Sequence, residues 1–214
     1  MKPNTFVFAG YHKTGSGVLC RTVKKYNNRT NSKHITSNHF NYISNNTIRN
    51  TKCVVIVRHP YEIIMSGSRY HMKTEEPWCC KQIYQDDRTY QDILQSLDPS
   101  ERILFEMRNC AFRTIMDIYN DMKNRNYNDN VLFIKLEELQ NDFNGTITKL
   151  YNHCNSAINI NLFTNLFNNT SIQLDYHKTT NDFAHTYPKH FEQVHYDEIN
   201  KLFPEDLLQV MGYK

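Results

Sequence analysis

Short continuous apolar runs alternate along this chain with stretches in which apolar residues recur at helical spacing. The apolar runs predict strands at residues 5–9, 52–57 and 131–136, and a further short strand fits within residues 27–51. Helical spacing predicts helices at residues 18–26, 61–69, 98–122, 142–154 and 194–211, the last interrupted at Pro204. Strands that alternate with helices predict an α/β fold with a central parallel β-sheet flanked by helices.

The helix that begins near residue 98 has the clearest start signal. Asp98 is a favourable N-cap, Pro99 suits the first helical position, and Glu101 can close a capping box. The apolar stripe that follows is assigned to the core and consists of Leu104, Met107, Ala111, Ile115, Ile118 and Met122. By contrast, residues 71–87 are expected to form a polar loop, and residues 155–175 show no clear period.

Length and composition favour one compact domain. The chain of 214 residues is long enough to bury a core, and without a repeat or linker it predicts a single domain over residues 1–214. The formal net charge of +3 and the dispersed basic residues argue against a nucleic-acid partner. No apolar run reaches the length of a membrane span and no leader is recognised, so a soluble, cytoplasmic protein is expected by default. The six cysteines lack metal-binding or redox spacing and are expected to be buried, reduced thiols.

Glycines are concentrated directly after the first predicted strand. Three of the six in the chain, Gly10, Gly15 and Gly17, fall in the turn and helix start that also contain Lys13. A strand, turn and helix in this order aim backbone N–H groups and the positive helix end at an anion such as phosphate or sulfate. Gly10 and Gly15 match the spacing of G-x-x-x-x-G-K-[ST], but Ser16 and Gly17 stand where that motif needs its Lys and its Mg²⁺-binding hydroxyl. The loop therefore predicts an anion site, and no metal ligand is predicted.

A second candidate for anion binding follows the strand at residues 52–57. The β-branched run predicts a strand buried on both faces, and Arg58 stands at its carboxyl end, where open α/β sheets bind ligands. Pro60 suits the first turn of the next helix, and Ser66 lies within that helix. A guanidinium fork and a hydroxyl suit a terminal phosphate. An ordinary surface arginine at a strand end is the alternative interpretation.

Together the two segments resemble the sulfotransferases that use 3′-phosphoadenosine 5′-phosphosulfate (PAPS) as donor. The Lys-Thr-Gly-Ser loop after the first strand and the Arg-x-Pro-x-x-x-x-x-Ser segment after a later strand carry the resemblance. It implies a P-loop NTPase-like sulfotransferase architecture. It also implies that the 5′-phosphosulfate is held by His12, Lys13, Thr14, Gly15, Ser16 and Gly17. Arg58 and Ser66 would hold the 3′-phosphate, with Lys178 as a further contact.

Three weaker similarities to the same family lie further along the chain. Residues 131–139 are similar to a strand followed by a Tyr-Glu-Asp-Leu-like segment, with Leu136 in place of the Tyr. Residues 207–213 resemble the closing helix and Gly-Tyr of the family. Lys178 is the one match to an Arg-Lys-Gly segment, where His177 replaces the Arg.

The resemblance implies sulfuryl transfer from PAPS to a hydroxyl or amine, with adenosine 3′,5′-bisphosphate (PAP) as product and no metal required. Lys13 is placed to neutralise the charge that develops on the leaving phosphate. The family usually carries its general base, a His or a Glu, between the two phosphate motifs, and that interval here holds His34 and His39 but no Asp or Glu. His39 is preferred because residues 38–42 resemble the base-carrying segment of the carbohydrate-type members. His34 is the second candidate and His71 a third.

The sequence leaves the acceptor open, with a small molecule or a carbohydrate expected. The chain is short for this family, which would leave the acceptor cleft open or completed by the second subunit of a homodimer. Two other functions are weighed against transfer. A P-loop nucleotide kinase or NTPase would need a Lys and a hydroxyl residue after Gly15. A catalytically inactive protein that binds adenosine bisphosphate would tolerate the departures at Leu136 and His177.

Overall fold

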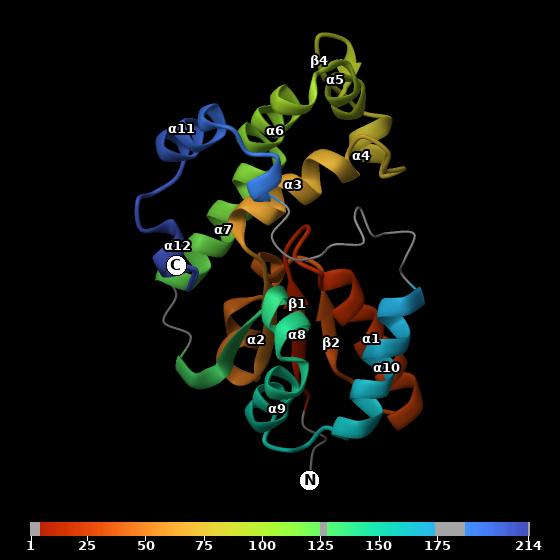
Figure 1. The fold of residues 1–214 in the computed structure, drawn as a ribbon. Helices are drawn as coiled ribbons and strands as arrows, with labels where there is room; N and C mark the ends of the chain where they lie inside the picture. The colour runs from red at the N-terminus through yellow and green to blue at the C-terminus, as the bar shows by residue number, and fades with distance from the viewer. Residues whose placement is uncertain (1–4, 125–127, 174–186, 214) are drawn as a thin grey trace. The chain divides into compact units, whose positions relative to one another are not determined.

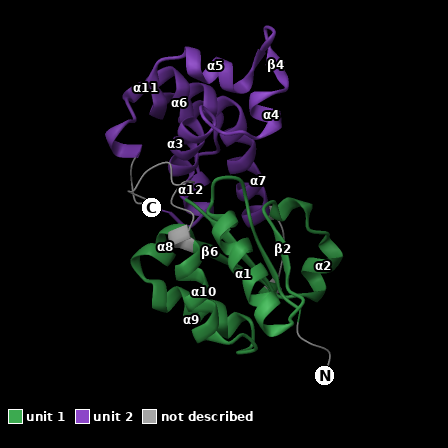
Figure 2. Ribbon diagram, turned by 90° about the vertical axis from the view of Figure 1, so that its right-hand side faces the viewer, with its two compact units in different colours: residues 1–58, 124–178 green, residues 59–123, 179–214 purple. Residues whose placement is uncertain are grey.

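The chain forms two compact units. The computed structural model describes residues 5–124, 128–173 and 187–213 (Figure 1). Unit 1 comprises residues 1–58 and 124–178, and unit 2 comprises residues 59–123 and 179–214, each over its described part (Figure 2). Whether the two units together make up the single domain predicted over residues 1–214 is not tested by this division, so that domain stays a prediction.

Within the described residues, unit 1 contains a four-stranded parallel sheet in the order β2-β1-β3-β6. Its strands are β1 (Val7–Gly10), β2 (Ile35–Ser37), β3 (Cys53–Val57) and β6 (Val131–Lys135). Its helices are α1 (Ser16–Thr30), α2 (Asn45–Asn50), α8 (Leu136–Asn141), α9 (Phe143–His153) and α10 (Ile160–Gln173), with short 3₁₀ turns η1 (Phe40–Tyr42) and η2 (Asn128–Asn130). The predicted α/β fold with a central parallel sheet flanked by helices is confirmed.

Burial explains why the two central strands, β1 and β3, could be predicted from the sequence. Every residue of β1 and β3 is buried, as expected for strands of a parallel sheet covered on both faces. One face contributes Phe8, Val54 and Ile56 to a core that also takes side chains from α1, α9 and α10. Figure 1 shows α1 and α10 side by side against the sheet. This apolar packing fixes the position of the strand ends from which the candidate site is built.

Residues 155–175, for which the sequence predicts no regular element, contain the helix α10. Its buried face is carried by Phe163, Leu166, Phe167 and Thr170, which recur at helical spacing. The Asn159 side chain accepts a hydrogen bond from the backbone N–H of Leu162 at 3.1 Å and so satisfies a donor of the first turn. The signal was present but was diluted by the surrounding asparagines.

Unit 2 is mainly helical in its described part. Its helices are α3 (Pro60–Tyr70), α4 (Pro77–Cys80), α5 (Tyr90–Ser96), α6 (Pro99–Arg108), α7 (Cys110–Asn124), α11 (Gln193–Leu202) and α12 (Leu207–Val210), with the 3₁₀ turn η4 (Tyr187–Lys189). A small hairpin joins β4 (Ile83–Gln85) to β5 (Arg88–Thr89). The hairpin and α4 occupy much of the stretch that was expected to be a polar loop. The last two helices flank Pro204, as predicted.

The helix predicted over residues 98–122 is divided at Asn109, whose backbone leaves the helical region. The start is as predicted, because Asp98 and Glu101 form the capping box and Pro99 begins α6. At the break, the backbone N–H of Cys110 donates to the hydroxyl of Tyr90, 20 positions earlier, at 3.4 Å. The core stripe continues through the break, and its members Met107, Ala111, Ile115 and Ile118 are buried.

None of the helices within residues 5–124, 128–173 and 187–213 combines the length and the apolar character that crossing a lipid bilayer requires.

Candidate functional site

Three neighbouring strands of unit 1 end at the same edge of the sheet. Gly10 of β1 pairs with Ile56 of β3, and Ile56 pairs in turn with Ile134 of β6. The loop of residues 11–15, Arg58 and the start of α8 therefore follow adjacent parallel strands at their carboxyl ends. Open α/β sheets bind ligands at this edge.

The loop between β1 and α1 is shaped by two left-handed residues and by its own hydroxyls. Lys13 has φ 61° and Gly15 has φ 87°, so the chain turns twice in a conformation that L residues seldom adopt. The buried Thr14 hydroxyl accepts from the backbone N–H of Tyr11 at 3.0 Å and donates to its carbonyl at 2.9 Å. The Ser16 hydroxyl donates to the same carbonyl at 3.2 Å. The predicted ligands Thr14 and Ser16 thus use their side chains to hold the loop, and the backbone N–H of Thr14 also donates to the Tyr11 carbonyl, at 3.3 Å.

The N-terminus of α1 has no side-chain cap. The first N–H groups of any helix lack an acceptor within it, and here the Gly15 cap position supplies no side-chain oxygen. The positive end of a helix, here one of 15 residues, is a kind of site at which proteins bind anions.

The three glycines of this region serve different purposes. A Cβ atom on Gly10 would lie 2.6 Å from Cγ2 of Ile56 and 2.8 Å from Cβ of Ser16, so Gly10 allows the loop to pass close to β3. Gly15 needs its positive φ, and its Cβ would come 3.0 Å from Leu136. A Cβ on Gly17 would meet nothing within 4 Å. Packing therefore accounts for two of the glycines and does not account for Gly17.

Arg58 joins the second candidate segment to this loop. Its Nη1 donates to the backbone carbonyl of Lys13 at 3.4 Å, and the residue is 7% exposed. The structure thus brings together Lys13 and Arg58, which lie 45 positions apart in the sequence. His12, in the same loop as Lys13, is half-buried.

His39 follows the carboxyl end of β2 and directly precedes η1. The next residue, Phe40, is buried, and its ring lies 6.1 Å from that of Tyr11 and 6.2 Å from that of Phe133. This anchor holds η1 near the loop while the His39 ring stays exposed, 5.1 Å from the Tyr42 ring. An exposed imidazole of this kind can accept a proton near neutral pH.

His34 lies at the opposite end of the strands. It precedes β2, and its ring packs against Phe6, Phe8 and Tyr26. Its Nδ1 accepts from the backbone N–H of Phe6 at 3.4 Å, and burial lowers its pKa below the ordinary 6.5. The structure therefore does not bring His34 to the loop, and its contacts are those of a packing residue.

Ser66 lies in α3 and is buried within unit 2. Arg58 belongs to unit 1, so the position of Ser66 relative to Arg58 stays a prediction. Lys178 lies outside the described residues.

A buried polar network in unit 2 was not found from the sequence. Nδ1 of His71 lies 2.8 Å from Oε2 of Glu106, and the Tyr90 hydroxyl donates to the same oxygen at 3.0 Å. A Cβ on Gly67 would lie 2.3 Å from Oε1 of Glu106, so Gly67 makes room for this carboxylate. Burial, and then the charge of Glu106, raise the pKa of Tyr90. The one sequence signal was an acidic residue inside the apolar stripe of α6.

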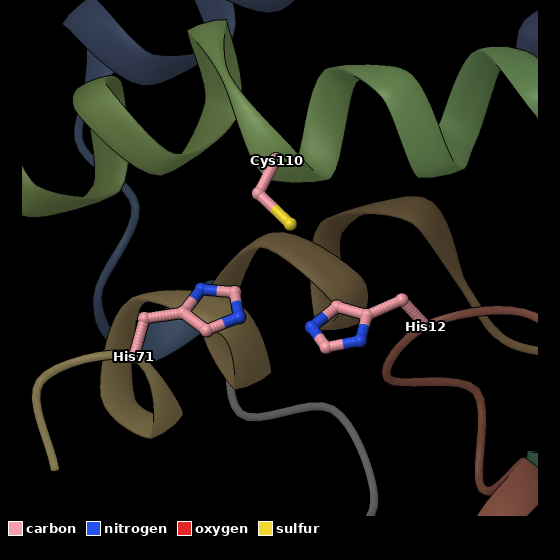
Figure 3. A group of neighbouring side chains, drawn as sticks. All are labelled: His12, His71 and Cys110. Atoms are coloured by element: carbon pink, nitrogen blue, oxygen red, sulfur yellow. The ribbon is translucent and has the colours of Figure 1, made fainter. Parts of the chain in front are cut away.

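His71 and Cys110, both of unit 2, lie close together, with ligand atoms within 4.8 Å of one another (Figure 3). His12, drawn in the same figure, belongs to the loop of unit 1. His71 is fully buried and engaged with Glu106. His71 is therefore a buried hydrogen-bond partner of Glu106 within unit 2.

No protein-family model matches this chain, and no curated protein matches its sequence. Solved structures do match. The crystal structure of mouse sulfotransferase SULT7A1 complexed with PAP superposes with a TM-score of 0.60 at 13% identity, covering 100% of this chain and 90% of that one. Retinol dehydratase in complex with androsterone and the inactive cofactor PAP superposes with a TM-score of 0.56 at 12% identity, covering 98% of this chain and 82% of that one. The chain therefore has the sulfotransferase fold.

Proposed function

We propose that this protein is a sulfotransferase that moves the sulfuryl group of PAPS to a hydroxyl or amine of a small-molecule or carbohydrate acceptor. The observation that carries the proposal is the contact between the Lys13 loop and Arg58 at one edge of the sheet. Two phosphate-binding elements side by side suit a nucleotide with phosphates at both ends. Both matching structures named above were crystallised with PAP, which has phosphates at its 3′ and 5′ positions.

The 5′ end of the donor would be held by the loop and the start of α1. The first-turn N–H groups of α1 and the Lys13 ammonium supply positive charge, with His12, Thr14, Gly15 and Ser16 forming the loop. Gly17 supports this placement, because it stands in a helix where packing leaves open space. A glycine that the fold does not require fits a place where backbone must approach a ligand.

The 3′-phosphate would be held by Arg58, with Ser66 and Lys178 as further contacts. The guanidinium fork suits a phosphate because it can offer parallel N–H donors to two oxygens. Arg58 follows a strand that is buried throughout, so its backbone is fixed at the sheet edge.

The reaction is an in-line transfer. A bond forms between the acceptor atom and sulfur while the bond between sulfur and the bridging oxygen breaks. The electron pair of the broken bond stays on the phosphate oxygen, and PAP leaves. Lys13 and the loop N–H groups stabilise the charge that builds on that oxygen. His39 takes the acceptor's proton, and its exposed position after the carboxyl end of β2 favours it over His34.

This function is tested by incubating the protein with PAPS labelled in sulfur and a panel of phenols, alcohols, amines and sugars. We expect PAP and labelled product to form together with at least one acceptor class, without added magnesium. The Lys13→Ala variant should lose turnover by about a hundredfold or more, as when one donor to a developing oxyanion is removed.

Other outcomes would assign the alternatives. Magnesium-dependent ATP turnover without PAPS turnover would identify a nucleotide kinase or NTPase. PAP binding without transfer to any acceptor, and without release of sulfate to water, would identify an inactive binding protein.

A further inference from the structure

Arg58 contacts the loop that carries Lys13. Its Nη1 donates to the carbonyl of Lys13 itself, at 3.4 Å. The proposed 3′-phosphate ligand therefore touches the backbone of the residue proposed to act at the 5′ end. This contact lies within unit 1 and does not depend on how unit 2 is placed.

Lys13 is the loop residue that most needs to be held. Its φ of 61° is in the left-handed region, which a residue with a side chain adopts at a cost in conformational energy. The hydroxyls of Thr14 and Ser16 bond to Tyr11 and fix the entry to the turn. The hydrogen bond from Arg58 acts on the peptide that leaves Lys13, so it restrains the direction in which the chain leaves this left-handed residue.

We propose that Arg58 is a positioning residue for Lys13 as well as a phosphate ligand. A guanidinium has five N–H donors, so one arginine can hold a backbone carbonyl and a phosphate together. The two ends of the donor site are then coupled through one side chain: loss of Arg58 loosens the 5′ cradle even when the nucleotide has no 3′-phosphate. The ligand part of this inference rests on the proposed function, and the loop part does not.

Binding of two nucleotides distinguishes a role of Arg58 in positioning Lys13 from a role in binding the 3′-phosphate alone. Affinities of PAP and of adenosine 5′-monophosphate, which lacks the 3′-phosphate, are measured by calorimetry for the wild type, Arg58→Ala and Arg58→Lys. The exposed Arg49 of α2 supplies the matched control, Arg49→Ala. We expect Arg58→Ala to lower the affinity for the monophosphate by about tenfold, the usual consequence of losing a charge-assisted hydrogen bond. Arg58→Lys should recover part of this loss, and Arg49→Ala should bind like the wild type.

An unchanged affinity of Arg58→Ala for the monophosphate, with weaker binding of PAP, would overturn the inference. Turnover gives a second readout that simple binding would not move. Because Lys13 acts in the transition state, saturating PAPS should leave kcat of Arg58→Ala about tenfold or more below the wild type. A normal kcat with a raised KM would overturn the inference as well.

Amide hydrogen exchange of the ligand-free protein tests the loop alone. We expect residues 13–17 to exchange faster in Arg58→Ala than in the wild type and Arg49→Ala, with unchanged protection in β1 and β3. Equal exchange in all three proteins would overturn the inference. If Arg58→Ala fails to fold, Arg58→Lys is compared in its place. Should the wild type bind neither nucleotide, the proposed function fails, while the exchange rates still decide the role of Arg58 in the loop.

Discussion

Gly10 and Gly17 are seven residues apart, and replacing them with Ala should change the free energy of unfolding in opposite directions. At Gly10 the new Cβ would lie 2.6 Å from Cγ2 of Ile56 and 2.8 Å from Cβ of Ser16. Carbon atoms pack best at roughly 3.5–4.0 Å, so β1, β3 or the start of α1 must move. Overpacking of this kind costs about 1–3 kcal/mol, partly offset by the stiffer unfolded chain of Ala. We therefore expect Gly10→Ala to lower the free energy of unfolding by about 2 kcal/mol.

At Gly17 the same methyl group meets nothing within 4 Å. Ala is the better helix former, so Gly17→Ala should raise the free energy of unfolding by about 0.5–1 kcal/mol. The same methyl group would stand where the donor's phosphosulfate is proposed to approach. The affinity for PAP should then fall by about tenfold or more, equivalent to about 1.4 kcal/mol of lost binding free energy.

Thermal unfolding followed by circular dichroism measures the stability difference, and calorimetry with PAP measures the affinity. One kcal/mol shifts the midpoint by about 2–4 °C in a chain of this length. The expected shifts are thus a fall of about 4–8 °C for Gly10→Ala and a rise of about 1–4 °C for Gly17→Ala. A Gly10→Ala variant as stable as the wild type would refute the close approach at β1. Wild-type affinity in Gly17→Ala would show that its open space is unrelated to the nucleotide.

Four further outcomes follow from the same structure. Lys13→Ala should reduce turnover by about a hundredfold or more while weakening PAP binding far less, and equal losses in the two measurements would exclude a role in the transition state. His39→Ala should lower kcat with little change in the thermal midpoint, because its ring is exposed, and full activity would remove it as the base. Burial lowers the pKa of His34 below 6.5, so as the pH drops below about 6.5 the unfolded chain binds this proton first and the free energy of unfolding should fall. The difference between the urea midpoints at pH 7 and pH 5 should therefore be smaller in His34→Gln than in the wild type, and an identical difference would contradict this. Burial raises the pKa of Cys53 to about 12, so a thiol reagent at pH 8 should modify Cys80, which is partly exposed, much sooner, as peptide mapping would reveal.

The sheet and the loop could be predicted because each requires particular residue types at neighbouring positions in the sequence. A strand covered on both faces reads as a continuous apolar run, as in β3. A loop with left-handed and close-packed positions reads as a cluster of glycines. The same local logic identified the capping box at Asp98. These features depend on residues near one another in the sequence.

The features that escaped prediction depend on contacts between distant residues. At the break after Asn109, the backbone N–H of Cys110 has its acceptor in the hydroxyl of the distant Tyr90. The carboxylate of Glu106 is acceptable in the core because His71 lies beside it, 35 positions earlier. The contrast between His34 and His39 is a matter of which end of β2 each one flanks, and five residues of sequence separation did not reveal it. The sequence could therefore narrow the candidates for the proposed general base to His34 and His39, and the structure shows that these two lie at opposite ends of β2.

Calorimetry of the wild-type protein with PAP, and separately with ATP and magnesium, tests the central claim most directly. The claim is that the Lys13 loop and Arg58 form two phosphate-binding elements for one adenosine nucleotide. The account predicts that PAP binds at least about tenfold more tightly than ATP, and that Lys13→Ala and Arg58→Ala each weaken PAP. Tight magnesium-dependent binding of ATP, with no measurable binding of PAP, would contradict it.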